Sequence, residues 1–318
     1  MSADDCFCEC CGAPLAAAPA AHPTPAPSEP AGCVDCGGSA VDPDGYCERC
    51  GRLQSAPTDH IEIELEALAG VTDKGLVHPR NEDSMALVEL DTDAQSFAVV
   101  VCDGVSTSQH ADQASRVAAD AAVAVLGKAL DDPSIDLVGA TADALATAQA
   151  AVIALVWDRT DALGPPSCTY VSALRRDGGA VVTASIGDTR AYWFASQGSA
   201  RLSPDDSWAA DQIAGGVDPA IAEADPRAHA ITHWLGVDAP ALAPHVVTQA
   251  IDEPGRLLVC SDGLWNYAST IERLAPMVQS GSPLDAAQIL NHFALEQGGH
   301  DNITVVVVTV APSKETSA

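Results

Sequence analysis

The feature that most constrains this chain is a set of four widely spaced aspartates, each beside a run of strand-forming residues: Asp83, Asp103, Asp262 and Asp301. Two of them, Asp103 and Asp262, follow short apolar runs and precede a glycine, which places a carboxylate at a strand end where the backbone can turn sharply. Carboxylates that converge from strand ends, without His or Cys at matching spacing, are ligands for Mg²⁺ or Mn²⁺ rather than zinc. A single Asp-Gly is more often an ordinary turn, so the prediction of a metal site depends on the whole set.

Two divalent ions held by such carboxylates would suit the hydrolysis of a phosphoester. This reaction needs an activated water and positive charge beside the non-bridging oxygens, and a pair of ions about 3.5–4 Å apart supplies both. The aspartates belong to an ordered series of motifs within residues 67–311: TDKG…NED, VCDG, SIGDTRAYW, LSPDDSW, HWLG, CSDGLW and HDNITVVVV. With these motifs the chain resembles the metal-dependent protein phosphatases of the PPM class, the type 2C Ser/Thr phosphatases, in their bacterial form.

The resemblance implies an α+β fold, a four-layer α-β-β-α sandwich. It also implies an enzyme that hydrolyses phosphoserine or phosphothreonine through a metal-bridging hydroxide, with two Mg²⁺ or Mn²⁺ ions in the active site. By position, Asp103 matches the carboxylate that bridges both ions, with the carbonyl of Gly104 as an added oxygen ligand.

The remaining site residues are also assigned by the resemblance. Asp262 and Asp301 match the ligands of one ion. Asp83 and Glu82 match residues that act at the other ion, mostly through coordinated waters. Asn302 is expected to brace the carboxylate of Asp301.

The substrate loop departs from the family pattern. Members commonly carry an arginine five residues before the aspartate of NED, where it binds the substrate phosphate, and this chain has His78 there. Either His78, when protonated, or Arg80 would then contact the phosphate. The glycine pair that usually follows DG is replaced by Ser106 and Thr107. These changes motivate an alternative function, a catalytically weak PPM-fold scaffold or phospho-dependent binding protein.

Two further family positions bear on the site. A third metal site in some relatives uses an aspartate four residues after that of SDG, and this chain has Asn266 there. We therefore expect a third ion to bind weakly or not at all. Asp188 in SIGDTR is a family signature, and we expect it to be a buried structural carboxylate paired with Arg190.

Cysteines define a second module near the N-terminus. Eight of the eleven cysteines precede residue 51, and four of them form a CxxC-x10-CxxC array: Cys33, Cys36, Cys47 and Cys50. Each pair is followed by a glycine, which suits two tight turns that hold one structural Zn²⁺ through four thiolates. Disulfides are the alternative, but nothing marks the chain as secreted. The array therefore predicts a zinc ribbon.

An earlier cluster, Cys6, Cys8, Cys10 and Cys11, contains one more CxxC without a partner pair. It is a degenerate half-ribbon, or it completes a second zinc site with Cys6 or His22, or it binds zinc only in an oligomer. Residues 13–31 are almost entirely Ala and Pro, which predicts an extended linker. The expected division is a ribbon module with this linker, residues 1–56, and a phosphatase domain, residues 67–311.

Charge and hydropathy restrict the compartment and the partners. The chain of 318 residues carries a net charge of −29, and only Arg49 and Arg52 are basic within residues 1–60, which argues against a nucleic-acid-binding ribbon. No apolar run reaches the ~18–20 residues of a membrane helix, and the acidic, Cys-rich N-terminus does not resemble a signal peptide. We expect a cytoplasmic protein that acts on phosphoprotein substrates of a Ser/Thr kinase, with a protein partner for the ribbon and no membrane.

The periodicity predicts Ala-rich helices near residues 109–126, 137–159 and 284–295. Strands are expected near residues 84–90, 97–102, 169–175, 180–186, 190–194, 256–260 and 303–310. Residues 203–232 are rich in Asp, Pro and Gly, and we expect them to form an irregular flap beside the active site.

Overall fold

The computed structural model describes residues 33, 36–42, 45–52, 54–90 and 93–312. The predictions for Cys6, Cys8, Cys10, Cys11 and His22, and for the linker at residues 13–31, lie outside the described residues.

Strand-forming runs build most of the protein. The strands are β1 (His60–Glu64), β2 (Leu68–Asp73), β3 (Asp83–Leu90), β4 (Asp93–Asp103), β5 (Ser167–Cys168), β6 (Tyr170–Arg175), β7 (Val181–Ile186), β8 (Arg190–Ala195), β9 (Ala200–Arg201), β10 (Leu235–Gly236), β11 (His245–Gln249), β12 (Gly255–Cys260) and β13 (Ile303–Val310). They form a six-stranded sheet, in the order β1-β2-β13-β12-β8-β9, and a five-stranded sheet, in the order β11-β7-β6-β4-β3. Strands β10 and β5 make a separate pair. All of these ladders are antiparallel.

The helices are η1 (Pro57–Asp59), α1 (Ala111–Asp131), α2 (Leu137–Ile153), α3 (Trp208–Ala214), α4 (Pro219–Glu223), α5 (Asp262–Trp265), α6 (Ile271–Val278) and α7 (Pro283–Glu296). Five of them, α1, α2, α5, α6 and α7, cover the outer faces of the two large sheets. Helices α1 and α2 share one apolar core with the five-stranded sheet. Helices α5, α6 and α7 share another with the six-stranded sheet.

A third apolar core lies between the two sheets. It includes Leu87 and Val99 from the five-stranded sheet, and Val259 and Val306 from the six-stranded sheet, all fully buried. Strand β13 reads ITVVVVTV and is buried on both faces, as a strand between a helical layer and a second sheet must be. The order helix, sheet, sheet, helix confirms the expected four-layer sandwich.

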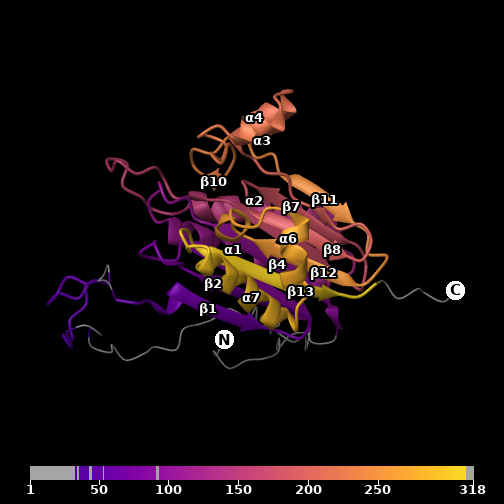
Figure 1. Ribbon diagram of the computed structural model, residues 1–318, viewed down its shortest axis with the longest axis horizontal. Coiled ribbons are helices and arrows are strands. Elements are labelled where there is room, and N and C mark those ends of the chain that lie inside the picture. Colours follow the sequence, from indigo (N-terminus) through magenta and orange to yellow (C-terminus); the bar gives the residue numbers. More distant parts are fainter. Residues whose placement is uncertain (1–32, 34–35, 43–44, 53, 91–92, 313–318) are drawn as a thin grey trace, which may run out of the picture.

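Two expectations about secondary structure were wrong. The flap contains α3 and α4, which pack through a small core of Ala209, Ala222 and Ala228 and project from the body in Figure 1. The helix expected to reach residue 159 ends at Ile153. The side chain of Gln109 binds the backbone N–H and carbonyl of Asp158, at 2.9 and 2.8 Å, and holds that segment as a loop.

The cysteine-rich segment projects from the body on another side, before β1 (Figure 1). Its described residues include an antiparallel bridge between Val41 and Cys47. Among those residues, no helix has both the length and the apolar character needed to cross a bilayer.

Candidate active site and metal centres

The topology brings the four predicted aspartates to one end of the sandwich, one pair from each sheet. Asp83 begins β3 and Asp103 ends β4, and the two residues are direct partners in the ladder. Asp262 begins α5, just after β12, and Asp301 lies just before β13, the strand that pairs with β12. Residues more than 200 positions apart therefore share one site because adjacent strands carry them.

Mutual repulsion and burial shape the electrostatics of this site. Asp83 is 6 % exposed, and burial raises its pKa to about 7, with the charges of Asp262 and Asp301 acting in the same direction. Burial and the charge of Asp301 raise the pKa of Asp262 to about 6. Burial and the charges of Asp83 and Asp262 hold the pKa of Asp103 well above its usual range. Such a cluster favours the binding of positive charge.

The donor set fits a divalent cation that prefers oxygen. Within the described part of the chain, Asp83 Oδ1 and Asp262 Oδ1 are buried and have no hydrogen-bond partner. Their second oxygens do have one: Ser261 Oγ donates to Asp83 Oδ2 at 2.7 Å, and Asn266 Nδ2 donates to Asp262 Oδ2 at 3.1 Å. Leaving a buried acceptor without a partner costs about 1–3 kcal/mol. Mg²⁺ or Mn²⁺ would satisfy both oxygens.

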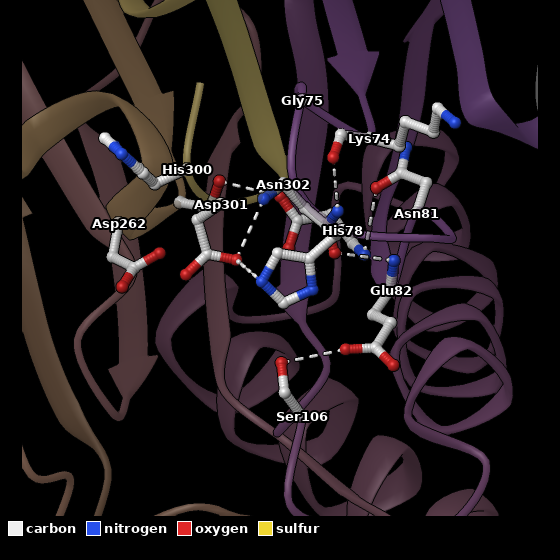
Figure 2. Close-up of polar contacts among 12 residues, drawn as sticks. Lys74, Gly75, His78, Asn81, Glu82, Ser106, Asp262, His300, Asp301 and Asn302 are labelled. Carbon is white, nitrogen blue, oxygen red and sulfur yellow. Dashed lines mark hydrogen bonds and ion pairs between the residues drawn. The ribbon is translucent and has the colours of Figure 1, made fainter. Parts of the chain in front are cut away.

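Asn302 ties the loop of residues 74–82 to the Asp301 segment. Its backbone N–H donates to Asp301 Oδ1 at 2.8 Å. Its side-chain nitrogen donates to the carbonyls of Lys74 and Arg80, both at 2.9 Å, and its side-chain oxygen accepts the N–H of Glu82 at 2.8 Å (Figure 2). This one side chain therefore fixes both ends of the loop beside Asp301.

The same loop holds the two candidate phosphate-binding residues, and they point to different partners. His78 Nε2 lies 3.3 Å from Asp301 Oδ1, so the imidazole faces the carboxylate cluster (Figure 2). Arg80 Nη1 donates to the carbonyl of Gln54 at 3.0 Å, in the segment that leads to the cysteines. Gly75 allows the loop to approach this closely, because its φ is +73° and a Cβ there would collide with the carbonyl of Asp301.

Three polar residues that the sequence analysis did not assign also contact the acidic residues. Ser261 donates to Asp83, as described above. Asn81 Oδ1 accepts the N–H of Asp83 at 3.2 Å. Ser106 Oγ donates to Glu82 Oε2 at 2.8 Å (Figure 2). Asn81 and Ser261 lie next to acidic residues in the motifs NED and SDG, so their positions in these motifs could have identified them from the sequence. The contact of Ser106 depends on the tertiary structure.

The expected pair between Asp188 and Arg190 does not form. The guanidinium of Arg190 instead makes two hydrogen bonds to Asp205, at 2.9 and 2.6 Å, and stacks on Trp265 with its Cζ atom 3.6 Å from the ring centroid. Asp205, from LSPDDSW, presents both carboxylate oxygens to the guanidinium, which is the stronger arrangement. Asp188 is buried, as expected, and burial with the charge of Asp262 raises its pKa well above the usual range.

The CxxC pairs form a second centre. The four thiol sulfurs of Cys33, Cys36, Cys47 and Cys50 all lie within 4.8 Å of one another. Two of the Sγ–Sγ distances, Cys33 to Cys50 and Cys36 to Cys47, are 3.5 and 3.6 Å. A disulfide needs about 2.05 Å, whereas sulfurs about 2.3 Å from a tetrahedral zinc are separated by roughly 3.8 Å. The geometry is compatible with one zinc ion and excludes the disulfide alternative for these residues in this structure.

The two CxxC turns have the same backbone geometry. The N–H of Gly37 donates to the carbonyl of Cys33 at 2.8 Å, and the N–H of Gly51 donates to that of Cys47 at 2.7 Å. Both glycines have positive φ, +68° and +71°. The sequence of each pair therefore specifies a tight turn that points two sulfurs to one centre.

Comparison with known proteins identifies the family. The profile of the family described as Protein phosphatase 2C matches residues 78–293. Over 244 residues the chain is 29 % identical to the serine/threonine protein phosphatase PstP of Mycobacterium tuberculosis, a match that spans 76 % of this chain but only 44 % of that protein. It is 28 % identical over 257 residues to the protein phosphatase PhpP of Streptococcus pneumoniae, spanning 79 % of this chain and 98 % of that one.

Solved structures give the same result. A crystal structure of the M. tuberculosis phosphatase superimposes with a TM-score of 0.63 at 28 % identity, covering 77 % of this chain and 98 % of that one. The catalytic domain of PstP in complex with two manganese ions gives a TM-score of 0.61 at 28 % identity, covering 76 % and 97 %. The chain belongs to the protein phosphatase 2C family.

Proposed function

We propose that the protein is a phosphatase that removes phosphate from phosphoserine and phosphothreonine in other proteins and depends on Mg²⁺ or Mn²⁺. The observation that carries this proposal is the convergence of four carboxylates. The pKa values of Asp83, Asp103 and Asp262 are raised, and Asp83 and Asp262 each present a buried oxygen without a donor. A relative named as a serine/threonine protein phosphatase and another named as a protein phosphatase support it, as does the manganese-bound structure of PstP.

The metal ligands in this proposal are Asp83, Asp103, Asp262, Asp301 and the carbonyl of Gly104. When bound, the ions would neutralise the phosphoryl oxygens and activate the attacking water. Gly104 suits its role because a Cβ there would lie 2.5 Å from the carbonyl oxygen of Ala111 and 2.7 Å from that of Glu82. A larger residue would displace the chain next to Asp103.

Other residues of the chain would orient these ligands. Ser261 Oγ accepts the N–H of Thr304 at 2.9 Å and donates its own O–H to Asp83 Oδ2, so this hydrogen bond fixes the orientation of the carboxylate. Asn302 does the same for Asp301. Ser106 Oγ would fix the carboxylate of Glu82, whose pKa is raised by burial, by donating a hydrogen bond to it.

His78 would contact the substrate phosphate in place of the usual arginine. Its support is its position against Asp301 on the loop of residues 74–82. A protonated imidazole adds one positive charge beside four acids, which favours a phosphate at this position. Arg80 is already engaged by Gln54.

The four-cysteine centre would hold one structural zinc in an N-terminal ribbon, followed by a phosphatase domain of residues 67–311. The support is the pair of matching CxxC turns and the separation of their sulfurs. All seven cysteines in the described residues are free thiols, which suits a reducing compartment such as the cytoplasm. Substrates would then be products of a Ser/Thr kinase.

A phosphate-release assay with a metal series tests the proposed function. We expect the purified full chain to release phosphate from phosphoserine and phosphothreonine peptides with Mn²⁺ or Mg²⁺, to act poorly on phosphotyrosine peptides, and to stop in EDTA. If the folded protein binds Mn²⁺ and a phosphopeptide but releases no phosphate with any divalent ion, the scaffold alternative is correct.

A further inference from the structure

The segment that joins the ribbon to β1, here termed the connector and comprising residues 54–59, lies against the loop of residues 74–82. Three hydrogen bonds cross between them. Arg80 Nη1 donates to the carbonyl of Gln54 at 3.0 Å, Asn81 Nδ2 to that of Thr58 at 3.3 Å, and the N–H of Lys74 to that of Asp59 at 2.8 Å. The connector is therefore bonded to the loop along its length.

The connector has a defined conformation of its own. Asp59 is 6 % exposed, and its Oδ2 accepts the N–H of Ala56 at 2.9 Å and lies 3.8 Å from Lys74 Nζ. At the other end, the N–H of Gln54 donates to the carbonyl of Gly45, in the ribbon, at 2.8 Å. Gln54 thus contacts the ribbon through its N–H and the loop of residues 74–82 through its carbonyl.

The bonds continue from the loop to the acidic residues. The carbonyl of Arg80 accepts from Asn302, and the N–H of Asn302 donates to Asp301. On the other branch, Asn81 accepts the N–H of Asp83. A contiguous path therefore runs from the ribbon through Gln54 and Arg80 to aspartates contributed by both sheets. Such a path is what physical coupling between two sites requires.

We propose that Arg80 is a positioning residue through which the four-cysteine ribbon sets the affinity of the carboxylate cluster for divalent ions. This inference rests on the proposed metal-dependent function. With the ribbon intact, Gly45 fixes Gln54, the carbonyl of Gln54 fixes Arg80, and the loop is ordered before an ion binds. When the ribbon loses its structure, the loop of residues 74–82 is no longer ordered in advance. Part of the free energy of ion binding is then used to order the loop, so the affinity of the carboxylate cluster for the ion falls.

Loss of zinc from the cysteines, or modification of their thiols, would then reduce the metal occupancy of the active site. The ribbon would act as a zinc- or thiol-responsive control on the enzyme. Arg80 thereby has a physical role in the loop of residues 74–82, because it binds the connector and not the carboxylate cluster.

The test measures Mn²⁺ affinity by calorimetry and amide hydrogen exchange on the full, zinc-loaded chain. The variants are Arg80→Ala, the ribbon variant Cys47→Ser/Cys50→Ser, and their combination, with Arg273→Ala, an exposed arginine on α6, as the matched control. We expect about a fivefold weaker Mn²⁺ affinity in each test variant, the low end of coupling between sites. The amides of Lys74 and Glu82 should exchange faster, and Arg273→Ala should match the wild type.

The combination separates the proposal from a purely local role of Arg80. If both changes act through one path, the combined variant should bind Mn²⁺ no more weakly than either single variant. Arg80→Lys keeps a donor for Gln54 and should restore part of the affinity. Wild-type affinity in Arg80→Ala would overturn the proposal. So would an Arg80→Ala defect that the ribbon variant lacks, or one that adds fully to it.

The phosphatase function and the coupling can be tested independently. A wild-type protein that binds Mn²⁺ but releases no phosphate would contradict the proposed function. In that case the Mn²⁺ affinities of the variants would still decide whether the ribbon is coupled to the carboxylate cluster. An active enzyme whose Mn²⁺ affinity ignores both Arg80 and the ribbon would contradict only the coupling.

Discussion

Neutralising Asp83 should stabilise the metal-free protein, although it removes a proposed metal ligand. In the absence of an ion, the buried carboxylate must ionise beside Asp262 and Asp301, and its pKa is raised from 3.8 to about 7. Asp83→Asn removes this charge at constant size. Ser261 Oγ, which donates to Asp83 Oδ2, can still donate to an amide oxygen. The variant therefore loses the repulsion and keeps the hydrogen bond.

The sign and size of the effect follow from the raised pKa. Because the folded state binds the proton more tightly, stability decreases as the pH rises from about 4 to about 7. A shift of about three pKa units corresponds to at most ~4 kcal/mol, shared with Asp103 and Asp262 because the group titrates together. If Asp83 accounts for about half of this energy, ~2 kcal/mol, then at about 2–4 °C per kcal/mol for a domain of this size metal-free Asp83→Asn should melt roughly 4–8 °C above the metal-free wild type at pH 7.5. Near pH 4 the two should melt together.

Thermal melts at several pH values, with and without Mn²⁺, measure this effect. Saturating Mn²⁺ should reverse the order, since only the wild type gains the full binding energy. Asp143→Asn, an exposed position on α2, is the control and should follow the wild type throughout. If Asp83→Asn melts at or below the wild type in EDTA at pH 7.5, the carboxylates do not repel one another as the structure indicates.

Three further changes test separate parts of the account. His78→Arg should lower KM for a phosphopeptide because arginine stays charged and can bind phosphate bidentately; an unchanged KM in both His78→Arg and His78→Ala would exclude His78 from the phosphate site. Elemental analysis of the reduced full chain after EDTA should find one retained zinc and no manganese, and a chain without zinc would refute the ribbon. Asp205→Ala should lower the free energy of unfolding by about 3–5 kcal/mol because buried Arg190 loses its partner. Asp225→Ala, which removes the more exposed pair with Arg227, should lower it much less, and denaturant melts that give equal losses would contradict this.

The sequence predicted the elements that carry strong local patterns. Strand β13 was predicted with its observed bounds because four consecutive valines between β-branched residues favour a buried strand. Strands β1 and β2 were missed: β1 reads HIEIE, too short and polar to stand out, and β2 contains Gly70. Helix α6 was also missed, since Pro276 lies inside it and proline disfavours a helix interior.

The candidate site likewise includes features that local sequence patterns predict and features that they do not. Asp103 and Asp262 could be located because each follows a strand run, so the sequence itself marks the end of the strand. The choice of partners could not be predicted, because it depends on which side chains the tertiary structure brings within reach. Arg190 binds Asp205 rather than Asp188, and Arg80 binds the backbone of Gln54. Both arginines lie in motifs whose local sequence suggests another partner.

The central claim, that four carboxylates hold divalent ions that hydrolyse phosphoserine and phosphothreonine, is tested most directly at Asp103. The measurement is phosphate release from a phosphothreonine peptide as Mn²⁺ is titrated, for the wild type and for folded Asp103→Asn. We expect saturable Mn²⁺-dependent turnover in the wild type and less than about a tenth of it in the variant. If Asp103 is a ligand of both ions, as the resemblance implies, its loss should raise the barrier by more than the ~1.4 kcal/mol of a tenfold change. Turnover above a tenth of the wild-type value at saturating Mn²⁺ would contradict the two-metal assignment.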